Sequence, residues 1–238
     1  PMSGTGSAAM EATIANTIEP GDTVLVAVTG YFGLRLADMA GRYRAEVKTI
    51  EKPWGEWFSL EELEAALLEH KPAILAMVHA ETSTGVCQPM DGVGDLCRKH
   101  DCLLLLDTVT SLGGVPLYID EWKVDLAYSC SQKGLSCPPG LGPFTMGPRA
   151  EAKMASRSGK VPNWYLDVSL LNKYWGSDRV YHHTAPVNMN FGMREALRLL
   201  AEEGLDQAWA RHRRNAEMLW SGLEGLGLSM HVPADRRL

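Results

Sequence analysis

The sequence predicts an α/β fold, with a mostly parallel β-sheet and helices packed on both of its faces. Three observations lead to this prediction. Short apolar runs of strand length alternate along the chain with longer runs of helical periodicity. Hydroxyl-bearing and charged residues follow several of these apolar runs, at the strand ends where open α/β sheets hold their ligands. No apolar run approaches the roughly 20 residues that a membrane helix needs.

The composition excludes several classes of partner. Of the 238 residues, 45% are hydrophobic and 22% are charged, and the formal net charge is −6. Nucleic acids and anionic membranes require basic patches, so we expect neither as a partner. The five cysteines show no CxxC pair and no metal-ligand spacing, so we expect reduced thiols and no metal site. No targeting segment is visible, and we expect a cytoplasmic location, or a peroxisomal or mitochondrial one in a eukaryote.

The elements of the first half follow from periodicity and from the glycines and prolines that separate them. One helix start is marked by Ser59 and Glu62, which fit a capping box of serine followed three residues later by glutamate. The expected helices are 7–18, 34–43, 59–70 and 92–100, and the expected strands are 23–28, 45–50, 73–78 and 103–107.

The second half is expected to be mainly helical after one further strand. Its elements are a strand at 126–128, an aromatic-rich segment at 163–175, helices at 189–203 and 205–226, and a strand at 228–232. The chain opens on Pro1 and stops soon after the last of these strands. We therefore expect it to be a piece of a longer polypeptide.

Two strand ends carry the residues with the clearest chemistry. Lys133 follows a buried strand on a tight turn, where desolvation would lower its pKa and make it a nucleophile for a carbonyl group; the alternative is a solvated turn lysine. Asp107 ends the all-apolar strand 103–107, 26 residues before Lys133. It is either an Asx cap or a carboxylate held at the ligand edge, with Val109 on the same side if the strand continues. A carboxylate for a ring nitrogen and a lysine for an aldehyde form the pair that pyridoxal phosphate enzymes need.

Three other stretches are candidate ligand contacts, each with a structural alternative. Residues 3–7 lead from glycines and hydroxyls into a helix start, which suits an anion, although a capped turn is equally common. Phe32 stands between two glycines after a strand, where it would either stack on a planar ligand or close the core. Thr82 belongs to a run of hydroxyls at another strand end, which could bind a ligand or form turns.

Several of these motifs agree in order and spacing with one family. The stretches Ser3-Gly4-Thr5-Gly6-Ser7, Asp107-Thr108-Val109 and Ser129-Cys130-Ser131-Gln132-Lys133 resemble the class V aminotransferases of fold type I. Residues 81–86 and 181–186 narrow the resemblance to the alanine–glyoxylate and serine–pyruvate aminotransferases. Without it, His182 and His183 would suggest a turn or a metal site, and the lack of a further ligand cluster disfavours metal.

The resemblance implies pyridoxal 5′-phosphate as cofactor and a role for each matching residue. Lys133 would bond the cofactor aldehyde, and Asp107 would keep the ring nitrogen protonated. Phe32, which often matches tryptophan in relatives, and Val109 would pack on opposite ring faces. The phosphate would be bound by Thr5, Gly6, Ser7 and Gln132, although some relatives have histidine at the position of Ser7. The phenolic oxygen of the ring would be bound by Thr82.

The resemblance also implies a homodimer with shared sites. Tyr181 and Thr184 would reach the phosphate of the neighbouring subunit, because the segment from Thr5 to Ser7 offers hydroxyl and backbone donors but no cationic side chain. The implied domains are a cofactor-binding large domain at 1–200 and, at 201–238, a connecting helix with the start of a small domain. In the family, the arginine that binds the substrate carboxylate lies further downstream.

The expected activity is transamination between a small amino acid, alanine or serine, and a 2-oxo acid, glyoxylate or pyruvate. Within the same scaffold, 2-aminoethylphosphonate transamination and cysteine desulfuration remain alternatives. A third alternative, from a different class, is a non-catalytic protein that keeps the fold.

Overall fold

A six-stranded β-sheet forms the centre of the molecule in the computed structural model, which describes residues 1–238. The strand order across the sheet is β10-β8-β7-β4-β2-β3. All neighbours are parallel except β10, which pairs antiparallel with β8 at one edge. This confirms the predicted, mostly parallel sheet. The strands are β2 (Thr23–Val28), β3 (Glu46–Glu51), β4 (Ile74–Val78), β7 (Leu103–Asp107), β8 (Leu126–Tyr128) and β10 (Phe144–Met146).

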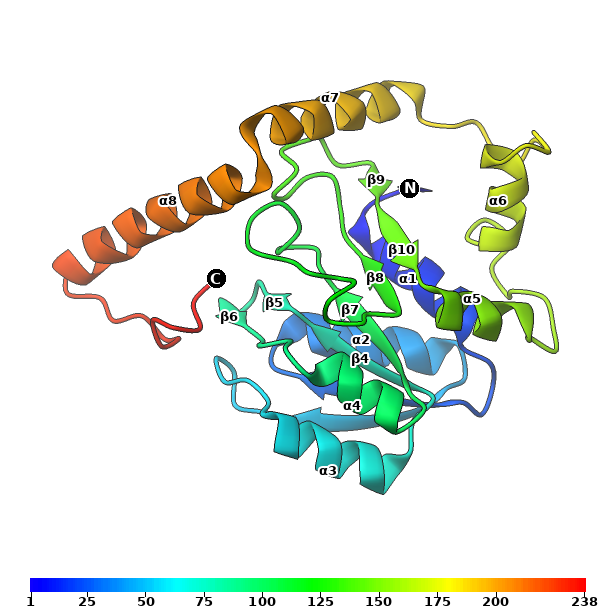
Figure 1. The fold of residues 1–238 in the computed structure, drawn as a ribbon, viewed down its shortest axis with the longest axis horizontal. Coiled ribbons are helices and arrows are strands. Elements are labelled where there is room, and N and C mark those ends of the chain that lie inside the picture. Colours follow the sequence, from blue (N-terminus) through cyan, green and yellow to red (C-terminus); the bar gives the residue numbers. More distant parts are fainter.

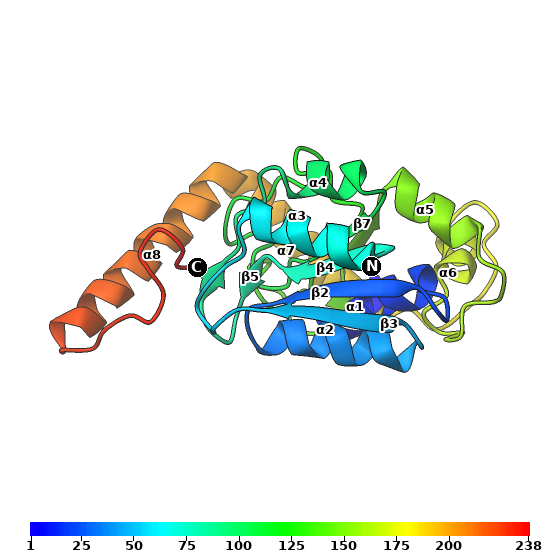
Figure 2. The same cartoon turned by 90° about the horizontal axis from the view of Figure 1, so that it is seen from below.

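Helices cover both faces of this sheet (Figure 2). On one face lie α1 (Gly6–Thr17), α2 (Tyr31–Arg42) and α5 (Pro148–Ala155), and on the other lie α3 (Leu60–His70) and α4 (Val93–Lys99). Successive strand residues therefore enter different cores. Val24, Val26 and Val28 of β2 belong to the first core, whereas Leu25 and Ala27 belong to the second. Burial on both faces is the reason that the strands are continuous apolar runs.

The start of α3 forms as its sequence predicts. Ser59 is the N-cap, its side chain accepts from the backbone N–H of Glu62, and the Glu62 side chain accepts from the backbone N–H of Ser59. The start of α2 differs from the prediction, because this helix begins at Tyr31, three residues before Leu34. Side chains from a distant part of the chain cap its first turn, and no local pattern could indicate them.

The remaining strands are short and lie outside the central sheet. They form two antiparallel pairs, β1 (Met2–Ser3) with β9 (Leu141–Gly142), and β5 (Ala80–Glu81) with β6 (Val86–Cys87). The first pair holds the start of α1 against the turn that follows Lys133. The second pair holds the loop that contains Thr82.

The C-terminal helices extend along the outside of the sheet domain (Figure 1). They are α6 (Val168–Trp175), α7 (Val187–Glu203) and α8 (Leu205–Gly225), and Gly204, with φ of 84°, separates the last two. After α8 the chain turns back, and its end lies beside β6, where the Cys87 N–H donates to the Arg236 carbonyl at 2.8 Å. None of the helices combines the length and the apolar composition that a membrane crossing requires.

The predicted strand at 228–232 is wrong. These residues are irregular, and the segment makes its only sheet-like pairing later, through the isolated bridge between Val86 and Arg237. A strand exists only where a neighbour offers hydrogen bonds, and no neighbour does so along 228–232. The apolar pattern of that stretch could not show this.

Candidate active site

Asp107 is a buried carboxylate at the carboxyl end of β7. Its side chain is only 2% exposed, and both oxygens are hydrogen-bonded. Oδ2 accepts from the Tyr128 hydroxyl at 2.6 Å, and Oδ1 accepts from the Val109 N–H at 2.8 Å. Burial raises the pKa of Asp107 to about 6, while the hydrogen bonds from Tyr128 and Val109 oppose that rise. Asp107 thus forms an Asx cap and is a buried carboxylate at the carboxyl end of the strand, and β7 ends at Asp107 instead of continuing to Val109.

The start of α1 packs directly against this region. A Cβ added to Gly6 would lie 3.0 Å from Cys130 Cβ and 3.2 Å from Val109 Cγ2. A side chain at this position would force its neighbours to give by a few tenths of an ångström. Thr5 is the N-cap but makes no side-chain bond to the helix, so the first N–H groups of α1 are not capped by a side chain. The structure therefore brings Thr5, Gly6 and Val109 together.

The start of α2 brings an aromatic ring and a cation to the same edge. Phe32 is partly buried, and its N–H donates to Glu81 Oε2 at 3.1 Å. The Arg35 guanidinium lies 4.8 Å from the centre of the Phe32 ring, and its Nη1 donates to Ser7 Oγ at 3.4 Å. The segment from Thr5 to Ser7 has no cationic side chain of its own, but Arg35 brings one beside it, which the sequence analysis did not foresee. The reason is that Arg35 belongs to a different helix, 28 residues away.

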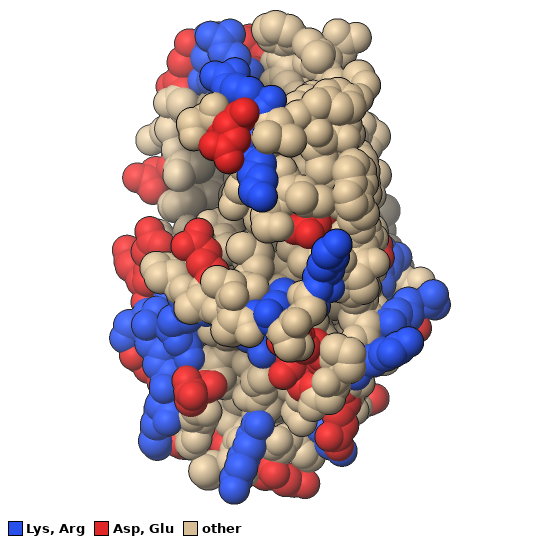
Figure 3. All heavy atoms as spheres, turned by 90° about the vertical axis from the view of Figure 1, so that its right-hand side faces the viewer, with Lys and Arg blue, Asp and Glu red and all other residues tan.

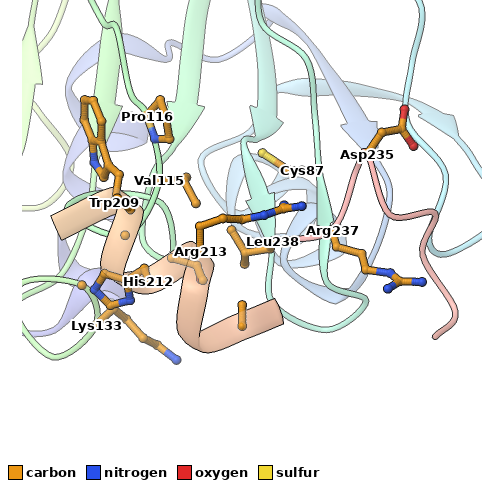
Figure 4. Close-up of a pocket in the computed structure, with 15 residues that line it drawn as sticks. Cys87, Val115, Pro116, Lys133, Trp209, His212, Arg213, Asp235, Arg237 and Leu238 are labelled. Carbon is orange, nitrogen blue, oxygen red and sulfur yellow. The ribbon is translucent and has the colours of Figure 1, made fainter. Parts of the chain in front are cut away.

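Lys133 lines a cavity of about 670 Å³ between the sheet edge and the C-terminal segment. The cavity is also lined by α8, with Trp209 and His212, and by the end of the chain, with Arg237 and Leu238 (Figure 4). Lys133 itself is exposed. The desolvation that its position predicted is therefore not provided, because the side chain lies at the wall of an open cavity and not inside the core.

The turn before and after Lys133 is rigidly built. Ser129 Oγ donates to the Thr108 carbonyl at 2.9 Å and Ser131 Oγ to the Pro138 carbonyl at 2.7 Å. These hydroxyls support the backbone and are not free for a ligand. A Cβ on Gly134 would lie 2.3 Å from the Leu112 carbonyl oxygen. Gln132 is exposed on the same turn. The position of Lys133 is thus set by close backbone packing.

Thr82 is connected to the cavity through Thr110. Its hydroxyl is hydrogen-bonded to the hydroxyl of Thr110, which lines the cavity together with Lys133. This contact joins the loop after β5 to the loop after β7.

Tyr181 and Thr184 are not brought into this site by their own chain. Tyr181 is 71% exposed, and its hydroxyl lies 3.2 Å from the Thr184 hydroxyl. Of the neighbouring histidines, His182 stacks on Trp164 with ring centres 4.2 Å apart, and His183 Nε2 lies 2.7 Å from Ser3 Oγ.

The face on which α6 lies is poor in charge over much of its upper part (Figure 3). Large apolar side chains are exposed in the segments from Trp164 to Phe191, namely Trp164, Tyr165, Trp175, Val180, Tyr181, Val187 and Phe191. An exposed apolar area of this kind is typical of an interaction surface.

Sequence reasoning missed three residues beside the candidate site. Tyr128 is paired with Asp107 in the register of β7 and β8, Arg35 follows Phe32 by about one helical turn, and Glu81 directly precedes Thr82. The spacing of Arg35 from Phe32 was visible in the sequence as a possible helical pair. The contacts of Tyr128 and Glu81 depend on strand order and had no local signal.

Comparisons with known proteins agree with this geometry. A family model described as Aminotransferase class-V matches residues 2–237. The chain is 44% identical over 234 residues to alanine–glyoxylate aminotransferase of Mus musculus, with 97% of this chain and 56% of that protein covered. It is 38% identical over 248 residues to (S)-ureidoglycine–glyoxylate transaminase of Bacillus subtilis strain 168, with 97% and 60% covered.

A solved structure is also similar. The crystal structure of an alanine–glyoxylate aminotransferase from Nostoc sp. matches with a TM-score of 0.98 and 67% identity, covering 100% of this chain and 63% of that one. The chain therefore spans about three fifths of the length of the relatives that it matches.

Proposed function

Because this chain belongs to the class V aminotransferases, we propose that it serves a pyridoxal 5′-phosphate-dependent transamination. The amino group would pass between a small amino acid, alanine or serine, and a 2-oxo acid, glyoxylate or pyruvate. The names of two similar proteins support the acceptor, since both are glyoxylate aminotransferases.

One observation carries this proposal. A buried carboxylate, Asp107, ends β7, and the turn after the neighbouring strand β8 presents Lys133 to a cavity. Parallel neighbours end at the same edge of the sheet, which supports the proposal that the two groups serve one site. The packing of the fold gives no reason of its own for a carboxylate and a lysine to occur together at this edge of the sheet.

The residues present fit the cofactor. Gly6 leaves room only for backbone beside Val109 and Cys130, and the uncapped first turn of α1 offers N–H donors to a phosphate. Thr5 and Ser7 add hydroxyls, and Arg35 adds positive charge at Ser7. Phe32 and Val109 are both partly buried at the margin of one core. We assign the phosphate to Thr5, Gly6, Ser7 and Gln132, the phenolic oxygen to Thr82, and the ring to Phe32, Asp107 and Val109.

The chain's own groups would perform the proton steps. When bound, the cofactor supplies an aldehyde that condenses with amines and a ring that withdraws electrons. Asp107 would hold the proton on the ring nitrogen. Lys133 Nζ, once free, would act as general base and take the proton from the substrate α-carbon. It would then act as general acid and donate that proton to the carbon of the cofactor aldehyde group.

We further propose a homodimer in which the partner completes the phosphate site. The Tyr181 side chain is exposed, and its hydroxyl lies beside that of Thr184, so a second subunit can receive the two hydroxyls. The division into a cofactor-binding domain at 1–200 and the start of a small domain at 201–238 is also a proposal. All five cysteines are unpaired, which supports a reducing compartment.

Covalent labelling tests the cofactor assignment. The chain is mixed with pyridoxal 5′-phosphate, reduced with borohydride and digested with trypsin. A label on Lys133 blocks cleavage there, so the pyridoxyl mass should appear on the peptide 124–149. Lys133→Ala should lose this peptide label, and Lys160→Ala, an exposed control, should keep it. A label on another lysine only, or none, would contradict the proposal.

The substrate pair is tested by product formation. We expect continued release of pyruvate from alanine only when glyoxylate is present, because without an acceptor each site can release no more than one pyruvate. Turnover of 2-aminoethylphosphonate in place of alanine would replace the proposed donor.

A further inference from the structure

The first turn of α2 is capped by side chains that lie about fifty residues away in the sequence. Its own N-cap, Gly30, has no side chain to offer. The Tyr31 N–H donates instead to Ser83 Oγ at 2.9 Å, and the Phe32 N–H donates to Glu81 Oε2 at 3.1 Å. These groups would otherwise have no partner within the helix.

Glu81 is a completely buried acidic residue, with 0% of its surface exposed. Its other oxygen, Oε1, accepts from the Ser83 hydroxyl at 2.6 Å and from the Ser83 N–H at 3.0 Å. It forms no salt bridge. A buried carboxylate is costly unless donors compensate it. Here the donors are the Phe32 N–H at the positive end of α2 and the N–H and hydroxyl of Ser83.

Gly30 is part of the same arrangement. A Cβ at this position would lie 2.4 Å from Glu81 Cγ and 2.5 Å from Ser83 Oγ. Glu81 can therefore reach the helix start only because residue 30 is a glycine. We call Gly30, Glu81 and Ser83 the α2 clamp.

The α2 clamp holds residues that face the site. Phe32 belongs to the clamped turn, and Arg35 lies one turn further, over the Phe32 ring and beside Ser7. The charges of Arg35 and Glu81 also act on Asp107, with opposite signs. A shift of this helix start would move both the aromatic ring and the cation.

We propose that Glu81 is a positioning residue of the site, which through the α2 clamp holds Phe32 and Arg35 beside Ser7 and Asp107. The inference rests on the proposed function, since it takes the bound ligand to be pyridoxal 5′-phosphate. Glu81 touches neither the cofactor nor the substrate in this proposal.

Glu81→Gln tests the clamp, because an amide turns one acceptor into a donor that faces other donors. We expect amide hydrogen exchange of residues 30–36 in the cofactor-free chain to become about tenfold faster. In a separate titration, the affinity for the cofactor should fall about tenfold. Glu62→Gln is the control, since the Glu62 carboxylate also accepts a backbone N–H at a helix start, that of Ser59 at α3 on the other face of the sheet. It should accelerate exchange in α3 only and leave the affinity unchanged.

A pH profile separates positioning from simple support of the fold. The groups that face Asp107 are Tyr128 and Cys130 from the β8 strand and turn, Glu81 from β5 and Arg35 from α2. Removing the negative charge of Glu81 should move the midpoint of the acid limb of cofactor binding to lower pH. Glu62→Gln should leave that midpoint in place.

The outcomes are distinct. If Glu81→Gln does not fold, Ser83→Ala replaces it. This change removes the acceptor for the Tyr31 N–H and the hydroxyl donor to Glu81 Oε1, and it should weaken binding about threefold. Equal affinity and equal exchange in wild type and the folded variant would overturn the inference alone. A wild-type chain that binds no cofactor overturns the proposed function, and the inference falls with it.

Discussion

The Tyr128 hydroxyl donates to Asp107 Oδ2 at 2.6 Å, and the two residues are direct partners across the parallel strands β7 and β8. The contact joins two fully buried groups. It lowers the pKa of Asp107 against the larger effect of burial, and burial together with the negative charge of Asp107 raises the pKa of Tyr128. The carboxylate is thus held in one orientation before any ligand binds.

Asp107→Asn should change stability in a way that depends on pH. Folding raises the pKa of Asp107 from its ordinary 3.8 to about 6. Between these values the folded chain keeps a proton that the unfolded chain releases, so the stability contributed by Asp107 falls as the pH rises through this window. The asparagine variant has no such loss. Its free energy of unfolding relative to wild type should increase by about 2–3 kcal/mol from pH 4 to pH 8, as measured by urea titration.

The same variant should bind the cofactor more weakly, because the charged partner of the ring nitrogen is lost. We expect an affinity loss of about 1.5–3 kcal/mol and a proton abstraction that is slower by orders of magnitude. Unchanged turnover with alanine as donor would rule out the role of Asp107.

Tyr128→Phe should raise the pKa of Asp107 further, because it removes a hydrogen bond to the charged form and keeps the bond from Val109. The cost at pH 8 should be about 1.5–3 kcal/mol, and it should shrink below pH 6. Denaturant unfolding at the two pH values measures the difference. An equal cost at both values would show that the phenol contributes packing only.

Gly6→Ala should impair cofactor binding without a comparable loss of stability. The added Cβ meets Cys130 Cβ at 3.0 Å and Val109 Cγ2 at 3.2 Å, so these side chains or the start of α1 must give by a few tenths of an ångström. We expect an affinity loss of about tenfold, measured by absorbance titration. Gly41→Ala is the control, because its Cβ has no neighbour nearer than 3.9 Å, and it should be neutral or stabilising by up to about 1 kcal/mol. Equal affinity in the two variants would argue against a close approach at Gly6.

Subunit mixing should reveal shared sites. Lys133→Ala chains are exchanged with Tyr181→Ala/Thr184→Ala chains, at a cofactor concentration too low to label either homodimer. In a heterodimer one site then has both defects and the other has neither. Borohydride label at Lys133 should reappear, and so should pyruvate formation from alanine. No recovery in confirmed heterodimers would mean that each chain builds its own phosphate site.

The sequence indicated the parts of the fold that depend on local patterns. Apolar runs predicted the strands of the parallel sheet, and the capping box at Ser59 predicted the start of α3. The positions of Asp107 and Lys133 after neighbouring apolar runs were enough to suggest one ligand edge. These features depend on periodicity or on residues within one turn of each other, and such local signals can be recognised in the amino-acid sequence.

Only the tertiary structure decided which distant side chains meet. Glu81 caps a helix 49 residues earlier, Arg35 reaches Ser7 across 28 residues, and Tyr128 meets Asp107 across 21. The same cause made 228–232 irregular and left Lys133 exposed, because a strand needs a partner and a buried lysine needs a closed wall. The order of β7, β4 and β2 in the sheet brings these strand ends and loops together, and that order results from packing between segments whose separation along the chain carries no local signal.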